Sequence, residues 1–181
     1  MKEIKVEIKG VTSYLMHAFS MEKSEEKSKK RIGIENYKDE VEKSLYKLPD
    51  GTIYVPSTQI HGTLIEAGKK FQIPGQRKAT FSKIIGGLVM ITPDAIKMNP
   101  QKFEIDSRAV VVPSTKGRIV RYRPKFNEWS LKFTIQNLEP EQIPESELKK
   151  ILDYAGSYVG IGDFRPNKKG PFGRFMVTMF E

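Results

Sequence analysis

The chain has 181 residues, which corresponds to one domain of ordinary size, and its 38% hydrophobic content is sufficient for a core. Its 31 Lys and Arg residues exceed 22 Asp and Glu, giving a net charge of +9 that favours an acidic partner. The absence of cysteine excludes disulfides, thiolate zinc sites, iron–sulfur clusters and cysteine nucleophiles. No apolar run reaches the roughly 20 residues of a membrane helix and no signal peptide is visible, so we expect a cytoplasmic protein with no membrane partner.

The first half of the chain predicts two strands and two helices. Residues 4–8 alternate apolar and charged side chains, which is typical of a half-buried strand. Residues 20–33 are densely charged and predict a mobile loop, and a short helix is expected at 34–48. A short strand at 52–55 stops at a proline, after which apolar residues at spacings of three and four predict a helix over 57–71.

The second half predicts a largely antiparallel sheet. Residues 86–92 form a short apolar run typical of a buried strand. Residues 103–112 and 118–123 predict a long hairpin connected by 113–117, and 129–136 give the clearest alternation in the chain. A helix over 144–159, a glycine-rich loop and a last strand at 174–180 follow. We therefore predict one α+β domain spanning residues 1–181, with helices on one face of the sheet.

Positive charge is concentrated in three windows of the sequence. Residues 68–83 and 108–125 contain no acidic residue, and 162–174 contain one, Asp163. The rest of the chain has more acidic than basic residues. This distribution favours a cationic surface for a polyanion, whereas the plainer interpretation is that the lysines and arginines solvate loops.

The segment RIVRYRPKF at residues 118–126 has the composition of a single-strand binding surface. Arg121, Arg123 and Lys125 fall on one side of an extended chain, with Tyr122 and Phe126 interleaved. Cations attract phosphates, and an aromatic face stacks on any base. The alternative is an exposed cationic hairpin whose tyrosine packs inward.

Residues 158–175 contain two pairs of glycines around an aromatic and several basic residues. A dinucleotide-binding fingerprint is excluded because Arg165 stands where a glycine is needed and a helix precedes the glycines. Glycines at such positions let backbone amides approach phosphates, although a plain helix-to-strand turn would have the same composition.

Three segments resemble a known family when taken in their order along the chain. The sequence VPSTQIHGTL at 55–64 resembles the strand-to-helix element of the repeat-associated mysterious protein (RAMP) superfamily of CRISPR systems, often IPGSSLKGxL. Residues 160–175 resemble its glycine-rich loop before the last strand. IKGVTSYLMH at 8–17 resembles the start of CRISPR backbone subunits and of related small phage or mobile-element proteins. Ser57 and His61 depart from the pattern, where glycine and a basic residue are usual.

The resemblance implies an RRM-like (ferredoxin-like) antiparallel sheet with helices on one face, beside which this chain has a long basic β-hairpin. It implies sequence-independent binding of RNA or single-stranded DNA by a homo-oligomer or filament, with other CRISPR-type subunits as partners in a ribonucleoprotein. We predict no cofactor and no metal. The predicted nucleic-acid-binding residues are His61, Lys69, Lys70, Arg77, Lys78, Arg118, Arg121, Tyr122, Arg123, Lys125, Phe126, Gly160, Gly162, Phe164, Arg165, Lys168, Lys169 and Arg174.

RNA cleavage is the alternative function, because the superfamily includes metal-independent endoribonucleases. His17 and His61 are candidate general acids or bases, but both also fit a core or helix-cap role. Asp39 lies in a mixed-charge run, and Asp106 and Asp163 are isolated in sequence, although folding could bring them together. We therefore predict a protein that is not an enzyme. A third interpretation is a structural protein whose basic windows meet an acidic protein surface.

Overall fold

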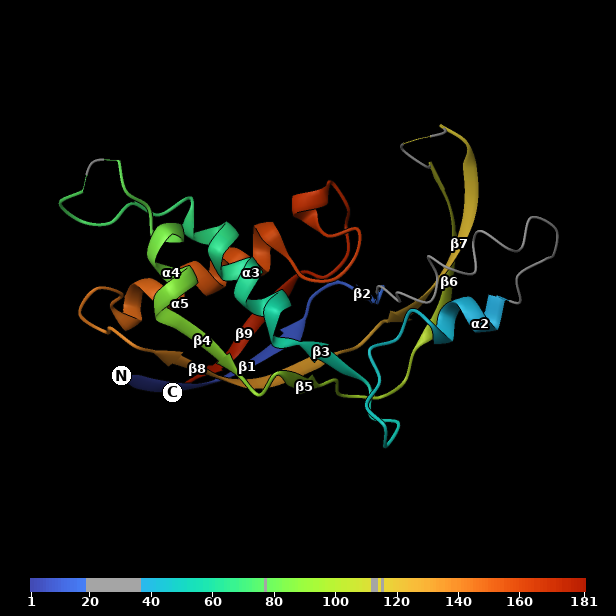
Figure 1. The fold of residues 1–181 in the computed structure, drawn as a ribbon, viewed down its shortest axis with the longest axis horizontal. Helices are drawn as coiled ribbons and strands as arrows, with labels where there is room; N and C mark the ends of the chain where they lie inside the picture. The colour runs from blue at the N-terminus through green and yellow to red at the C-terminus, as the bar shows by residue number, and fades with distance from the viewer. Residues whose placement is uncertain (19–36, 77, 112–113, 115) are drawn as a thin grey trace.

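The computed structural model describes residues 1–18, 37–76, 78–111, 114 and 116–181. A four-stranded sheet forms its base, with the strand order β4-β8-β1-β9 and antiparallel pairing throughout (Figure 1). The strands are β1 (Lys2–Gly10), β4 (Val89–Thr92), β8 (Ser130–Asn137) and β9 (Phe175–Phe180). Central β1 pairs with β8 on one side and β9 on the other, so the first and last strands of the chain are neighbours.

The helices lie on one face of this sheet and bury its apolar side (Figure 1). They are α3 (Ser57–Gly68), α4 (Ser82–Leu88) and α5 (Glu145–Tyr154), which continues into a π-helical turn, η1 (Ala155–Val159). Because side chains alternate along a strand, Ile4, Val6 and Ile8 all point toward the helices and are buried. On α3, the predicted apolar residues Ile60 and Leu64 are buried as well. These elements confirm the predicted α+β class.

A long hairpin projects beyond the sheet, as predicted (Figure 1). It consists of β6 (Glu104–Val111) and β7 (Arg118–Phe126), and the two-residue β2 (Tyr14–Leu15) pairs with the base of β7. The short helix α2 (Tyr37–Glu42) packs against β7 and replaces the longer helix predicted for 34–48. The charged segment 20–33, and residues 113 and 115 of the predicted connection 113–117, lie outside the described residues.

Two other elements differ from the sequence prediction. Gly86 and Gly87 belong to α4, so the strand predicted from residue 86 begins at Val89. The cause is helix packing: Ile85 is fully buried, and a Cβ on Gly68 of α3 would lie 2.8 Å from the backbone nitrogen of residue 82. A short pair, β3 (Tyr54–Pro56) with β5 (Ala95–Lys97), was predicted only for its first strand, because three residues show too little alternation.

Candidate nucleic-acid interface

A groove crosses the molecule between α3, the loop that follows η1 and the β6–β7 hairpin. It consists of two cavities of about 420 and 530 Å³ that share the lining residues His17 and Asp163. The first cavity lies against α3 and the second against the hairpin. The groove therefore joins the three segments whose motifs and charge indicated function.

The side of α3 that lines the first cavity is polar and fixed by hydrogen bonds. It includes Thr58, Gln59 and Thr63. The Tyr14 hydroxyl donates to Gln59 Oε1 at 3.0 Å, and Thr63 Oγ1 donates to the Gly160 carbonyl oxygen at 3.0 Å. Burial raises the pKa of the Tyr14 phenol far above its usual value, so this hydroxyl remains a donor. The wall is thus held in one arrangement.

The glycine-rich loop, residues 160–174, forms the middle of the groove and is bonded to the start of the chain. The backbone N–H of Asp163 donates to the Leu15 carbonyl at 2.9 Å, and that of Gly173 donates to the Ser13 carbonyl at 2.8 Å. Gly173 has a φ of +74°, in the left-handed region that favours glycine. The loop residues that line the groove are consequently held on a fixed backbone.

Phe164 and Arg165 point into different parts of the groove. Phe164 lines the second cavity, is 38% exposed, and has its ring 6.1 Å from that of Phe172. Arg165 lines the first cavity and donates from Nη1 to the Gly162 carbonyl at 2.9 Å. An accessible ring beside an oriented guanidinium can contact a base and a phosphate of one strand.

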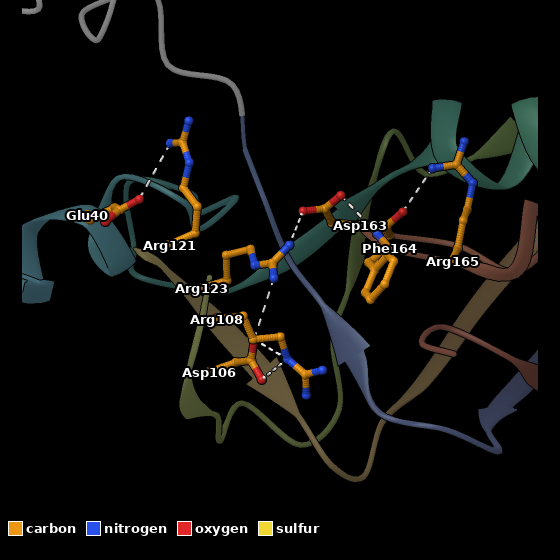
Figure 2. A network of polar contacts seen from close by, with 9 residues as sticks. Glu40, Asp106, Arg108, Arg121, Arg123, Asp163, Phe164 and Arg165 are labelled. Carbon is orange, nitrogen blue, oxygen red and sulfur yellow. Dashed lines mark hydrogen bonds and ion pairs between the residues drawn. The ribbon is translucent and has the colours of Figure 1, made fainter. Parts of the chain in front are cut away.

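A buried ion-pair network connects the hairpin to this loop. Figure 2 shows Arg123 between Asp106 of β6 and Asp163 of the loop. Arg123 Nη1 is 2.7 Å from Asp163 Oδ2, and Nη2 is 3.6 Å from Asp106 Oδ2. The Nε of Arg108 donates to both carboxylate oxygens of Asp106, at 2.8 and 2.9 Å. The two aspartates that are isolated in sequence therefore meet on one arginine.

The three cations predicted to share one side of β7 all face acidic partners. Arg121 lies 3.5 Å from Glu40 of α2, and Lys125 lies 3.3 Å from Glu104 of β6. Arg123 is only 5% exposed. A phosphate that approached these groups would compete with carboxylates already in place. Arg123 is therefore corrected from a surface phosphate contact to a buried element of the groove floor.

Phe126 also differs from its predicted role as a stacking platform. It is fully buried, with ring centroids 6.1 Å from Tyr14 and 5.7 Å from Phe103. Its position at the base of β7, where β2 pairs, places it in the core. Tyr122 is half-buried, and Phe164 is the predicted stacking residue with the most accessible ring.

The remaining predicted residues are spread around the groove instead of sharing one wall. Gly160 is buried next to α3, whereas Lys168 and Lys169 are exposed just after the groove residue Asn167. The other exposed residues are Arg118 near the hairpin tip and Lys69, Lys70 and Lys78 at and after the end of α3. His61 and Arg174 are half-exposed. The groove is not lined by these two residues, nor by Arg118, Lys69, Lys70 or Lys78. Arg77 lies outside the described residues.

Sequence reasoning missed two features of this region. Glu40, which pairs with Arg121, comes from a distant helix, and no local pattern indicates it. The stacked pair Tyr154 and Tyr158 was also missed, although a spacing of four residues on a helix is a signal for contact.

The described residues also bear on metal binding, catalysis and membranes. Within the described ranges, no three His, Asp or Glu residues come together as a possible metal site. His17 lines both cavities, and Asp39 is exposed on α2. None of the described helices combines the length and apolar character needed to cross a membrane.

Comparison with known proteins supports the fold. No protein-family model and no curated protein matches the sequence. Among solved structures, the chain is similar to one in the cryo-EM structure of the type III-B Cmr-beta bound to cognate target RNA, with a TM-score of 0.59 and 15% identity. That match covers 99% of this chain and 59% of the other. Cmr6 from Pyrococcus furiosus matches with a TM-score of 0.45 and 11% identity, over 97% of each chain. The likeness to the Cmr-beta chain shows that this chain shares its α+β fold.

Proposed function

We propose that this chain binds RNA or single-stranded DNA in the groove without sequence preference and without cutting it, as a RAMP-type subunit. The observation that carries the proposal is the composition of the groove, which combines an accessible aromatic ring with a set of oriented arginines. Stacking on such a ring and attraction of phosphates are the two contributions that sequence-independent single-strand binding needs.

The charge of the groove is arranged in two layers. Its lining contains four arginines and two carboxylates, and two further carboxylates, Glu40 and Asp106, stand behind the arginines. The floor is therefore close to neutral but pre-ordered, so that a strand need not immobilise flexible side chains on binding. Exposed Lys168, Lys169 and Arg118 at the margins supply the excess positive charge for phosphates.

The outer face of strands β1 and β8 is polar and charged, unlike the groove with its accessible aromatic ring. RRM proteins stack bases on aromatic residues of their sheet, but the outward positions of β1 and β8, both described in full, carry Glu3, Lys5, Glu7 and Lys132 among other non-aromatic residues. The order β1-α3-β4-β8-α5-β9 supports the finer ferredoxin-like assignment. The binding surface is then on the helical side, in the groove.

The proposed partners are RNA and the other subunits of a ribonucleoprotein. The RNA in the Cmr-beta structure supports RNA as the ligand of this chain, and a CRISPR-type ribonucleoprotein as its setting. We also propose that several copies assemble along one strand. A filament of this kind gains affinity as the strand becomes longer.

Co-purification tests the proposed function. We expect protein washed in high salt to retain single-stranded nucleic acid, detected by its absorbance ratio and nuclease sensitivity, in particles heavier than a monomer. Affinity for added oligonucleotides should rise with their length. A clean monomer that binds no added oligonucleotide would refute the function, while salt-sensitive binding without length dependence would favour an acidic protein partner.

RNA cleavage by the protein would show that its function is catalysis and not binding alone. End-labelled RNA should be recovered intact after incubation with the protein. Product that disappears in His17→Ala, His61→Ala or Asp39→Ala would instead identify an endoribonuclease and overturn the non-catalytic assignment.

Lys168 and Lys169 of the glycine-rich loop provide a direct test of binding at the groove. In the double variant Lys168→Ala/Lys169→Ala, the slope of log affinity against log salt concentration should become shallower by about 1.4, because two phosphate contacts are lost. The matched control is Lys5→Ala/Lys9→Ala, which removes the same charge from the outer face of β1 and should leave the slope unchanged. Equal losses in both variants would mean that net charge, and not the groove, determines binding.

A further inference from the structure

An exposed aromatic pair lies at the end of α5, outside the groove. The Tyr158 side chain stacks on Tyr154, with ring centroids 4.7 Å apart and planes inclined by 29°. The Tyr154 ring also packs against Phe71, which follows α3, with ring centroids 5.6 Å apart and the two planes at 87°. Tyr158 itself is 63% exposed. A large ring is therefore held in a fixed orientation by its neighbour while much of its surface faces solvent.

Positive groups flank this pair, which we call the tyrosine platform (Tyr154 and Tyr158). The Nη1 of Arg174 donates a hydrogen bond to the carbonyl oxygen of Ser157, the residue immediately before Tyr158. Lys70 is exposed and immediately precedes Phe71, which supports Tyr154. An exposed aromatic face with an arginine held beside it has the composition of a site for an unpaired nucleobase and its phosphate.

The platform is next in the chain to a residue that lines the groove. Val159, the residue after Tyr158, lines the first cavity together with Glu66 of α3. Glu66 in turn pairs with Lys69 at the C-terminal end of α3, close in sequence to Lys70. Tyr158 is therefore the exposed neighbour in the chain of a residue that lines the first cavity.

We propose that Tyr158 is a stacking site for one unpaired base of the strand, just beyond the groove. The proposal rests on the proposed function and adds to it a contact that reads no sequence, because every base has a face to stack. Tyr154 fixes the ring before the base arrives, which reduces the entropy lost on binding. Arg174, whose guanidinium is held at the Ser157 carbonyl, is the proposed phosphate contact beside that base.

The test compares Tyr158→Ala with Tyr158→Phe in binding to single-stranded oligouridine over a range of salt concentrations. Tyr158→Ala should weaken binding by about tenfold or more, while Tyr158→Phe retains the wild-type affinity because the ring face remains. The salt slope should be the same in all three proteins, since stacking releases no counterions. Abasic nucleotides at the contacted position should weaken wild-type binding but have no further effect on Tyr158→Ala.

Two controls separate the platform from the fold and from the groove. Met176→Ala removes a side chain that is 54% exposed on β9 and should leave affinity unchanged, and thermal unfolding of each variant checks the fold. If Tyr158→Ala binds like wild type while Lys168→Ala/Lys169→Ala weakens binding, the platform is refuted and the groove stands. A loss in Tyr158→Phe equal to that in Tyr158→Ala would also refute stacking. If wild-type protein binds no strand, the proposed function fails first.

Discussion

Replacing Arg123 with alanine should lower the free energy of unfolding by about 2 kcal/mol, because the hydrogen-bonded ion pair with Asp163 is lost and the buried Asp106 keeps only Arg108 as its cationic partner. Arg123 is 5% exposed and Asp106 is 7% exposed, so water cannot take the place of the guanidinium at Asp106. The same change releases Asp163, and with it the connection between the loop and the hairpin. Urea or thermal unfolding measures the effect, which corresponds to a fall in Tm of roughly 6 °C.

Arg121→Ala is the matched control for this prediction. It removes the same side chain from the same side of β7, but Arg121 is more exposed and pairs with Glu40 at the longer distance of 3.5 Å. Such a pair contributes about 1 kcal/mol or less. Arg123→Lys should behave nearly like Arg123→Ala, because a lysine cannot contact Asp106 and Asp163 together as the forked guanidinium does. Equal stability of Arg121→Ala and Arg123→Ala would show that the network does not hold the hairpin.

The elements that the sequence predicted well are those whose pattern is local. The alternation of β1 and the apolar stripe of α3 are properties of a few adjacent residues, and the hairpin strands are marked by a turn between extended runs. Burial of Phe126 and the helical state of Gly86 depend instead on distant packing against β2 and α3, which no window of the sequence contains.

Part of the arginine network could have been deduced from the hairpin register. A turn centred between residues 114 and 115 places Asp106 opposite Arg123 and Glu104 opposite Lys125, as the structure has them. Opposite charges at directly facing positions attract each other, so two of the cations were predictable as paired. The contact of Arg123 with Asp163 was not, because it spans 40 residues of chain and depends on how the glycine-rich loop folds.

Gly173→Ala should strongly damage the glycine-rich loop. A Cβ at this position would lie 1.8 Å from the carbonyl oxygen of Ile161, a backbone atom that cannot rotate away, and the φ of +74° adds strain for any L side chain. Relieving the clash would break the bond from the Ile161 N–H to the Gly173 carbonyl. We expect a loss of about 3 kcal/mol in unfolding free energy from strain and overpacking together.

Strand binding should fall in the same variant, because the displaced loop contains Phe164 and both loop lysines. Gly75→Ala is the control: Gly75 has nearly the same φ, +76°, but open space where the Cβ would be. It should lose only about 1–2 kcal/mol, the cost of the left-handed conformation, and keep its affinity for oligonucleotides. Measuring both variants by urea unfolding and oligonucleotide titration separates the steric cost from the conformational one. Wild-type affinity in Gly173→Ala would mean that the strand does not need this loop geometry, and the groove would no longer be the binding site.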